Sequence, residues 1–136
     1  MLRWWSLAFG IACVLLLTFA MVALSGVSLL DDPTTGLDPI VATTVDDEIV
    51  KLRDLEHVTG IVVTHQIRDA FYVATHRAVQ QDGSVQIGAV PDGAPPPAEF
   101  MVLHDGQIRF EGTSTELLAA QDNYLQDLLF MTLPPW

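Results

Sequence analysis

Acidic and histidine side chains directly follow two short segments that are predicted to be strands. Residues 27–30 are largely apolar and lead into Asp31 and Asp32, and the apolar residues 61–63 lead toward His65. Ligands bind at the carboxyl ends of strands in open parallel sheets, so these three side chains are candidates for chemistry. Two adjacent carboxylates suit Mg²⁺, because one can hold the metal through water while the other polarises an attacking water. His65 could contact a phosphoryl group and stabilise charge there.

A helix is predicted between these two strands. Asp38 is a suitable N-cap, and Pro39 suits the first helical position. Apolar residues then recur at helical spacing as far as Leu55, and Gly60 is expected to end the helix. The three acids at 46–48 are expected to form a solvated face near the start of this helix, where the helix dipole favours negative charge.

The following segment predicts a second helix and a short strand. Apolar residues from Ile67 onwards have helical spacing, and Val79 could extend this helix. Asp82-Gly83 predicts a turn, and the alternation around residues 85–87 predicts a strand. Four prolines within residues 91–97 exclude regular helix or an inner strand, so we expect an exposed loop there.

The last third of the chain predicts a hairpin and two helices. Residues 100–103 and 108–110 flank Asp105-Gly106, a pattern typical of a β-hairpin. Thr113 with Glu116 forms a capping-box pattern, and residues 124–129 mark a last short helix. Because strands alternate with helices in the first part, the fold class is expected to be α/β, with a parallel sheet and helical crossovers.

Composition and charge narrow the classes of function. Lys and Arg number 6 against 17 Asp and Glu, which gives a formal net charge of −11 in 136 residues. A protein that binds phosphate backbones needs a basic footprint, so direct nucleic-acid binding is not expected. The single cysteine, Cys13, excludes an internal disulfide and any multi-cysteine metal site.

Residues 1–26 form a hydrophobic leader. Arg3 is its one charged residue, and no charge follows until Asp31. The run is long enough for a transmembrane helix, with Trp4 and Trp5 at one interface, and it could also be a secretory signal peptide. The leader alone therefore predicts a single-pass membrane protein whose remaining residues lie outside the cytoplasm.

Several motifs of the remaining chain match a known family. Residues 29–39, LLDDPTTGLDP, resemble the Walker B and D-loop segment of ATP-binding cassette (ABC) transporter ATPases, and residues 62–66, VVTHQ, resemble their switch-histidine strand. Residues 100–120 are similar to the hairpin and helix that close this domain. Residues 65–79 and 123–130 most resemble the phospholipid and organic-solvent-tolerance branch, whose ATPases serve mammalian-cell-entry-type importers.

This resemblance covers residues 27–136 and implies the C-terminal part of a P-loop NTPase sheet with flanking helices. It implies ATP and Mg²⁺ as cofactors, with Asp31 holding the metal through water and Asp32 in the place of the catalytic glutamate. It also implies that His65 contacts the γ-phosphate. Asp38 would act across a dimer interface, and Gly36 belongs to the same nucleotide-facing segment. The implied partners are an integral-membrane permease and a second ATPase subunit, at the cytoplasmic face of a membrane.

The sequence also departs from the family. It contains no GxxxxGK[ST] loop to cradle phosphates, no Q-loop and no LSGGQ-type signature, and Asp32 is one methylene shorter than glutamate. One hypothesis is therefore a partial ATP-binding subunit, inactive alone, whose leader is a mistranslated or mis-started segment. A second is a membrane-anchored, non-enzymatic interaction module derived from that fold. A magnesium-binding signalling receiver is a third, but it needs a further strand-end aspartate and a suitably placed lysine.

Overall fold

The computed structural model describes residues 26–132, and the leader up to residue 25 lies outside the described residues. Its elements follow one another along the chain as β1 (Val27–Asp31), α2 (Pro39–Asp54), β2 (Thr59–Val63), α3 (Ile67–Thr75), β3 (His76–Gln81), β4 (Ser84–Ala89), β5 (Phe100–His104), β6 (Gln107–Gly112), α4 (Ser114–Ala119) and α5 (Asn123–Thr132). The expected α/β class is confirmed. Within residues 26–132, no helix is long and apolar enough to cross a membrane.

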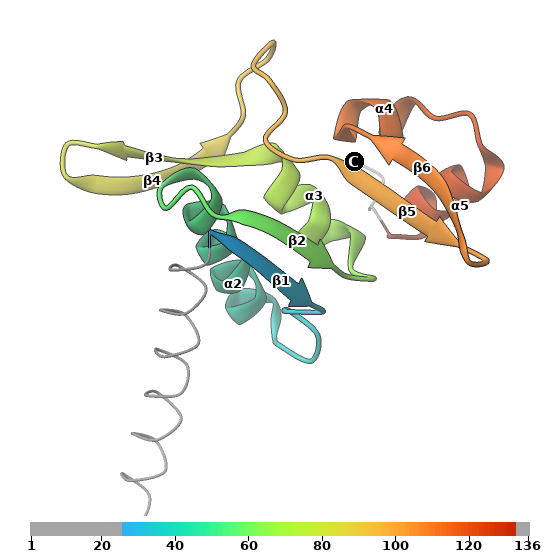
Figure 1. Cartoon of the computed structure of the whole chain (residues 1–136), viewed down its shortest axis with the longest axis horizontal. Helices are drawn as coiled ribbons and strands as arrows, with labels where there is room; N and C mark the ends of the chain where they lie inside the picture. Colours follow the sequence, from blue (N-terminus) through green and yellow to red (C-terminus); the bar gives the residue numbers. More distant parts are fainter. Residues whose placement is uncertain (1–25, 133–136) are drawn as a thin grey trace, which may run out of the picture.

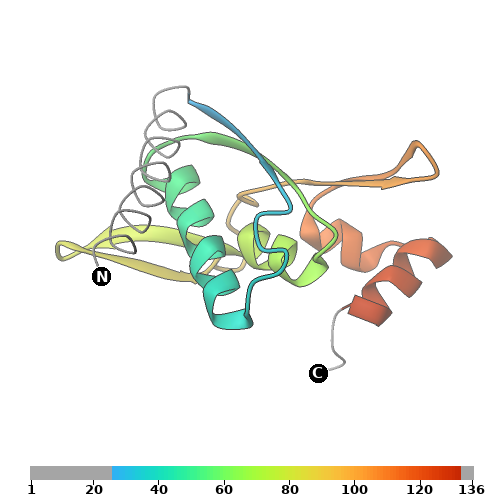
Figure 2. The ribbon, with the colours of Figure 1, turned by 90° about the horizontal axis from the view of Figure 1, so that it is seen from below.

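The strands of the described part pair two by two. β1 and β2 are parallel and are joined through α2, whereas β3–β4 and β5–β6 are antiparallel hairpins. Figures 1 and 2 show α2 and α3 on the same side of the β1–β2 pair, with the β5–β6 hairpin, α4 and α5 grouped at one end. The expected parallel sheet with a helical crossover is therefore present as two strands.

Short-range signals in the sequence account for several element boundaries. The carboxylate of Asp38 accepts hydrogen bonds from the N–H groups of Ile40 (3.0 Å) and Val41 (3.2 Å), so it caps α2 as expected. Thr113 and Glu116 form the expected capping box of α4. Both hairpins turn at an Asp-Gly pair in which the two residues have positive φ, the geometry of type I′ turns.

Two boundaries differ from expectation. Helix α2 ends at Asp54, and Gly60 lies inside β2 instead of ending the helix. His57, with a φ of 54°, reverses the chain direction first, and the Val58 N–H then bonds to the Leu52 carbonyl. Val79 lies in β3, because its backbone pairs with β4 and this cross-strand pairing overrides helical spacing.

A partly buried ion pair joins α2 to the segment where α3 meets β3. The Arg53 guanidinium donates to both carboxylate oxygens of Asp54 (2.8 Å each) and to the carbonyls of Val73 (2.6 Å) and His76 (2.7 Å). Asp54 also accepts from the Ala78 N–H at 2.8 Å. Burial raises the pKa of Asp54, but the bonds from Arg53 and Ala78 outweigh it and leave the pKa below its usual value. Two helices and a strand are thus fastened at one point.

The ion pair and hydrogen bonds of Arg53, here called the Arg53 clamp, can be tested by removing the guanidinium group. Arg53→Met should lower the free energy of unfolding by about 2 kcal/mol, because it leaves the partly buried Asp54 carboxylate without its charged partner. The control is Arg109→Met, which breaks the more exposed pair with Asp122 (2.6 Å) and should cost less than about 1 kcal/mol. Urea unfolding measures both values, and equal losses would contradict the assignment.

Candidate functional site

The parallel register of β1 and β2 brings the predicted site residues to one edge. Asp31 pairs with Val63, and the Asp32 N–H donates to the Val63 carbonyl at 2.7 Å. Both strands therefore end at the same level, and the chain leaves each of them with a polar residue. Asp32 has a φ of 44°, a left-handed conformation that non-glycine residues rarely adopt. This turns the chain sharply at the strand end.

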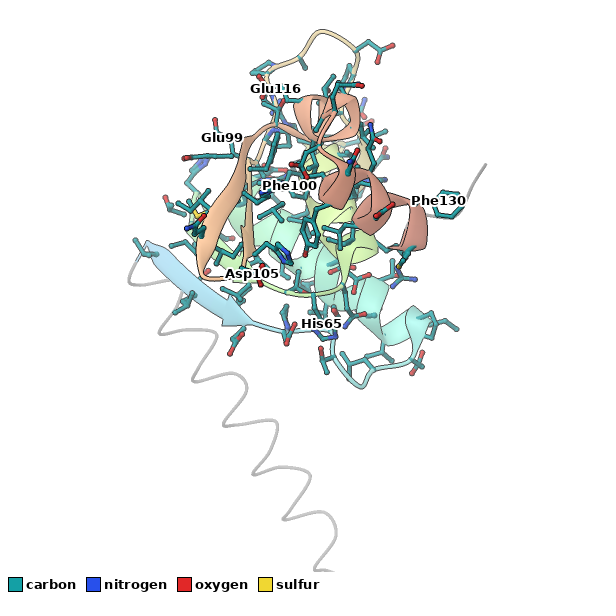
Figure 3. The ribbon with its side chains drawn as sticks, turned by 90° about the vertical axis from the view of Figure 1, so that its right-hand side faces the viewer. His65, Glu99, Phe100, Asp105, Glu116 and Phe130 are labelled. Atoms are coloured by element: carbon teal, nitrogen blue, oxygen red, sulfur yellow. The ribbon has the colours of Figure 1, made fainter. Side chains whose placement is uncertain are left out.

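Asp32 and His65 are in direct contact at this edge. One carboxylate oxygen of Asp32, Oδ1, lies 2.9 Å from His65 Nδ1 and accepts from the His65 N–H at 3.3 Å. Figure 3 shows His65 beside the carboxyl end of β1. Burial raises the pKa of Asp32, but the backbone and ring of His65 outweigh this and lower it below the usual value. The His65 side chain is 71% exposed, so the pair is open to a ligand from solvent.

The other two carboxylates of the predicted site differ in their surroundings. Asp31 is exposed at the end of β1. Asp38 lies beyond the turn, and its carboxylate is occupied as the N-cap of α2. Gly36, with a φ of 78°, allows the turn between them, where the Leu37 N–H donates to the Thr34 carbonyl at 3.2 Å. The structure therefore brings Asp31, Asp32 and His65 together at the carboxyl ends of β1 and β2. It gives Asp38 a structural role as the N-cap of α2.

Gln66 connects this turn to α3. With its oxygen facing the turn, the Gln66 amide accepts from Thr34 Oγ1 (3.1 Å) and from the Thr35 N–H (3.2 Å), while its nitrogen donates to Asp69 Oδ2 (3.3 Å). Thr34 is 2% exposed, so these bonds are shielded from water. Gln66 therefore holds the turn in place from the side of α3, a role that its position after the β2 strand did not predict.

Asp46 and Asp47 contradict the expectation of a solvated face at residues 46–48, whereas the Glu48 side chain is 46% exposed. Asp46 is 3% exposed, and Asp47 accepts a hydrogen bond from the Tyr72 hydroxyl at 2.6 Å. Both face α3, where Asp69 is likewise 3% exposed and pairs with Arg68 at 2.7 Å. The helical period that predicted α2 also places these acids toward α3, but the sequence does not show where α3 packs.

Burial favours the uncharged form of two acidic side chains at this interface. Burial, together with the negative charge of Asp69, raises the pKa of Asp46 to about 7, although Arg68 opposes the shift. Burial and the hydrogen bond to Asp47 raise the pKa of Tyr72 to about 12, so its hydroxyl stays a donor. The α2–α3 contact behind the site therefore contains one carboxyl that changes its protonation state near neutral pH.

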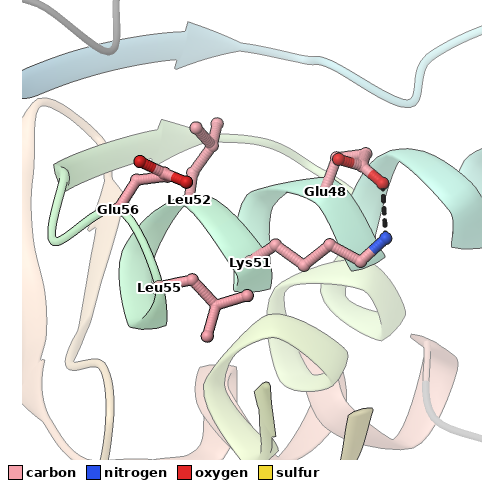
Figure 4. A pocket seen from close by; sticks show the side chains of 5 residues that line it. All are labelled: Glu48, Lys51, Leu52, Leu55 and Glu56. Atoms are coloured by element: carbon pink, nitrogen blue, oxygen red, sulfur yellow. Dashed lines mark hydrogen bonds and ion pairs between the residues drawn. The ribbon is translucent and has the colours of Figure 1, made fainter. Parts of the chain in front are cut away.

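A shallow hollow lies along α2, away from this edge. It measures about 160 Å³ and is lined by Glu48, Lys51, Leu52, Leu55 and Glu56. Figure 4 shows the ion pair between Lys51 Nζ and Glu48 Oε1 (2.6 Å) across one side of it. Among residues 26–132, no group of three or more His, Cys, Asp or Glu side chains could by itself hold a metal ion. The carboxyl ends of β1 and β2, where Asp31, Asp32 and His65 lie, thus remain the candidate site.

Comparisons with known proteins point to one family over part of the chain. The chain matches no protein-family model. It is 39% identical over 59 residues to ABC transporter I family member 17 of Arabidopsis thaliana, covering 43% of this chain and 22% of that protein. It is 32% identical over 63 residues to the trimethylamine N-oxide transport system ATP-binding protein TmoW of Ruegeria pomeroyi, covering 46% and 18%.

A longer match extends over most of the chain. The energy-coupling factor transporter ATP-binding protein EcfA2 of Bacillus licheniformis is 29% identical over 97 residues, which cover 71% of this chain and 26% of that protein. The matched part is thus about a fifth to a quarter of the length of these relatives. The homologues are ABC transporter ATP-binding proteins, and this chain is similar to a part of their ATPase domain.

The contact between Asp32 and His65 predicts that the pKa of the Asp32 carboxylate depends on the His65 side chain. Since the pKa of Asp32 is lowered, its contribution to stability is present above the ordinary pKa of 3.8 and is lost as pH falls through the lower folded value. In His65→Ala the Asp32 carboxylate should titrate closer to 3.8, as followed by carbon-detected NMR. His104→Ala, which removes the contact with Asp105 (3.3 Å), serves as the control and should leave Asp32 unchanged.

Asp46 predicts an unusual dependence of stability on pH. With a folded pKa near 7, the native state holds a proton that the unfolded chain releases, so the free energy of unfolding falls as pH rises from about 4 to about 7. Asp46→Asn should therefore stabilise the protein at pH 8, on the order of 1–2 kcal/mol after allowance for solvent screening, and should give almost no gain at pH 4.

Thermal unfolding at several pH values measures this effect. Asp47→Asn is the matched control, because Asp47 is the neighbouring acid and loses only part of its bond to Tyr72. We expect it to cost about 1 kcal/mol with little dependence on pH in this range. A gain from Asp46→Asn that is the same at pH 4 and pH 8 would contradict the raised pKa.

Proposed function

We propose that this chain supplies the Walker B, D-loop and switch-histidine part of an ABC transporter ATP-binding subunit. The observation that carries the proposal is the contact between Asp32 and His65 where the two parallel strands end (2.9 Å). An acid and a histidine held together where two parallel strands end, with a second acid beside them, would suit the terminal phosphate of a Mg²⁺-nucleotide. The homologues named above support the same class.

Each residue receives a distinct role in this proposal. Asp31 would hold Mg²⁺, because its carboxylate is exposed and Mg²⁺ takes one or two protein acids and completes its shell with phosphate and water. The bound metal would neutralise phosphate charge. Asp32 would orient the attacking water, and its carboxylate also holds His65, which would contact the γ-phosphate. Gly36 lies on the nucleotide-facing turn.

The wider assembly follows from the family. Asp38 would act across the interface with a second ATPase subunit, while its carboxylate also caps α2. A membrane permease would couple ATP hydrolysis to transport, with the ATPase at the cytoplasmic face. Residues 65–79 and 123–130 favour lipid or organic solvent as the transported class. The 136 residues contain no GxxxxGK[ST] loop, so we expect no turnover of ATP by this chain alone.

A second candidate is a non-enzymatic interaction module derived from the same fold. Two observations favour it: the sequence has no phosphate-binding loop, and Asp32 stands where the family has glutamate. Its carboxylate is also engaged by His65, which restricts it from orienting a water. The two candidates differ in one measurable property, since only the first retains a weak, metal-dependent contact with ATP at the strand edge.

Paramagnetic NMR of the full chain distinguishes them. Mn²⁺ replaces Mg²⁺ and broadens nearby signals even when binding is weak. We expect Mn·ATP to broaden the amide signals of Gly36 and His65 and to leave Gly83, in the β3–β4 turn, sharp. Asp31→Asn should remove most of this effect, whereas Asp105→Asn, at the exposed tip of the β5–β6 hairpin, should not.

Two other outcomes of this experiment would count against ATP binding at the carboxyl ends of β1 and β2. Uniform weak broadening that Asp31→Asn does not change would mean that the metal binds the acidic surface at large. Absence of any selective broadening would reject the ATP-binding candidate in favour of the interaction module.

A further inference from the structure

One amide side chain fastens the turn between β1 and α2 to the start of α3. The Thr35 N–H donates to the Asp32 carbonyl and to the Gln66 amide oxygen, at 3.2 Å each, and the same amide oxygen accepts from Thr34 Oγ1 at 3.1 Å. Thr34 is 2% exposed, so these bonds are shielded from competing water. The path of the chain after Asp32 therefore depends on the side chain of Gln66.

Asp69 determines which end of the Gln66 amide faces this turn. An amide has a donor at one end and an acceptor at the other, so its two orientations suit different partners. With the oxygen toward the turn, the Gln66 nitrogen donates to Asp69 Oδ2 at 3.3 Å. The reverse orientation keeps a bond from the nitrogen to Thr35 Oγ1 (3.3 Å), but it points the oxygen at the Asp69 carboxylate, where two acceptors meet. The Asp69 carboxylate thus selects the orientation that holds the turn.

Asp69 lies in the contact between α2 and α3. These helices pack against each other, and Figure 2 shows the turn that leads into α2 beside the first turn of α3. Tyr72, three residues after Asp69 and therefore on the same face of α3, donates to Asp47 of α2 at 2.6 Å. Asp46 of α2 and Asp69 of α3 are each 3% exposed. Each helix thus contributes one buried carboxyl to the contact.

The charge of this contact depends on Asp46. The charged groups that act on its carboxyl are Asp69 and Arg68 of α3 and Asp47 of α2. Tyr72 stays neutral, because its pKa is raised to about 12. Burial and the charge of Asp69 raise the pKa of Asp46 to about 7, so this carboxyl is largely neutral at pH 6 and largely ionised at pH 8. Arg68 pairs with Asp69 at 2.7 Å and offsets one of the two negative charges present at pH 8.

Repulsion between α2 and α3 would act directly on the bonds of Gln66. The turn leads into Asp38, the N-cap of α2, whereas Gln66 is the N-cap residue of α3. The bonds between the turn and Gln66 therefore bridge the two helices, as the pair of buried carboxyls does. Like charges repel more strongly in a buried contact than in water, because the local dielectric constant is lower. Ionisation of Asp46 therefore opposes these bonds.

We infer that Gln66 is a positioning residue of the candidate site, through which the protonation state of the acids between α2 and α3 acts on the turn after Asp32. When Asp46 holds a proton, the Gln66 amide binds the turn and fixes the path of the chain. When Asp46 is ionised, these bonds weaken. The inference rests on the proposed function only in treating this turn as nucleotide-facing, because the connection itself needs no nucleotide.

Exchange of the Thr35 amide proton with water tests this connection in the full chain without nucleotide. NMR gives the exchange rate at pH 6 and at pH 8, and the intrinsic rate at each pH divided by the measured rate gives the protection factor. We expect the protection of Thr35 to be about threefold lower at pH 8, because its bond to Gln66 is weakened but not broken. The Val58 N–H, which bonds to the Leu52 carbonyl, is the internal reference and should keep its protection.

Three variants separate the contributions to this effect. Asp46→Asn removes the titrating group, so Thr35 should keep the protection of pH 6 at both pH values. Gln66→Met removes the amide but keeps the length of the side chain, so the protection of Thr35 should fall about tenfold at both pH values. Gln126→Met removes an amide of α5 that bonds to the Ala120 carbonyl (3.3 Å), and as the matched control it should leave Thr35 unchanged.

Three results would overturn the inference. Equal protection of Thr35 at pH 6 and pH 8 would show that Asp46 does not act on the turn. A pH dependence that persists in Asp46→Asn would assign the effect to another group, such as the histidine in contact with Asp32. A dependence that persists in Gln66→Met would show that charge acts on the turn without the amide.

Two safeguards keep this test decisive. If Gln66→Met also lowers the protection of Val58, that variant has lost its fold, and Asp46→Asn decides alone. Failure of the Mn·ATP experiment would reject the proposed function, whereas only the exchange of Thr35 at the two pH values decides the connection through Gln66.

Discussion

The backbone hydrogen bonds between β1 and β2 are the constraint on which the candidate site depends. Parallel strands cannot be joined by a short turn, so the chain between them must form a crossover, and α2 is that crossover. In-register pairing makes both strands end at the same level, and their polar successors, Asp32 and His65, therefore meet. A shift of one residue in this register would turn the side chains of a strand to the opposite face.

Features with a local cause could be read from the sequence. The cap at Asp38, the capping box of Thr113 and Glu116, and the Asp-Gly turn at Asp105 all depend on residues within three or four positions of one another. The meeting of Asp32 and His65 could also be anticipated, although they are 33 positions apart, because sheet topology fixes where strand ends lie.

Features that depend on tertiary packing could not be read in this way. Asp46 belongs to an acidic run that is typical of a solvated face, yet α3 covers it. The Arg53 clamp needs carbonyls that lie 20 and 23 positions further along the chain, and no local signal in the sequence points to them. Val79 has helical spacing, but pairing with β4 determines its conformation. In each case a partner distant in sequence overrides the local preference.

Because the pKa of Asp46 is raised in the native state, folding near neutral pH is coupled to the uptake of a proton. Near pH 6 the native protein holds a proton at this carboxyl, with a pKa of about 7, that the unfolded chain does not hold. Folding at this pH therefore withdraws a proton from the buffer, and the heat measured by calorimetry includes the ionisation heat of that buffer. The native molecule is correspondingly less negative than its formal charge of −11.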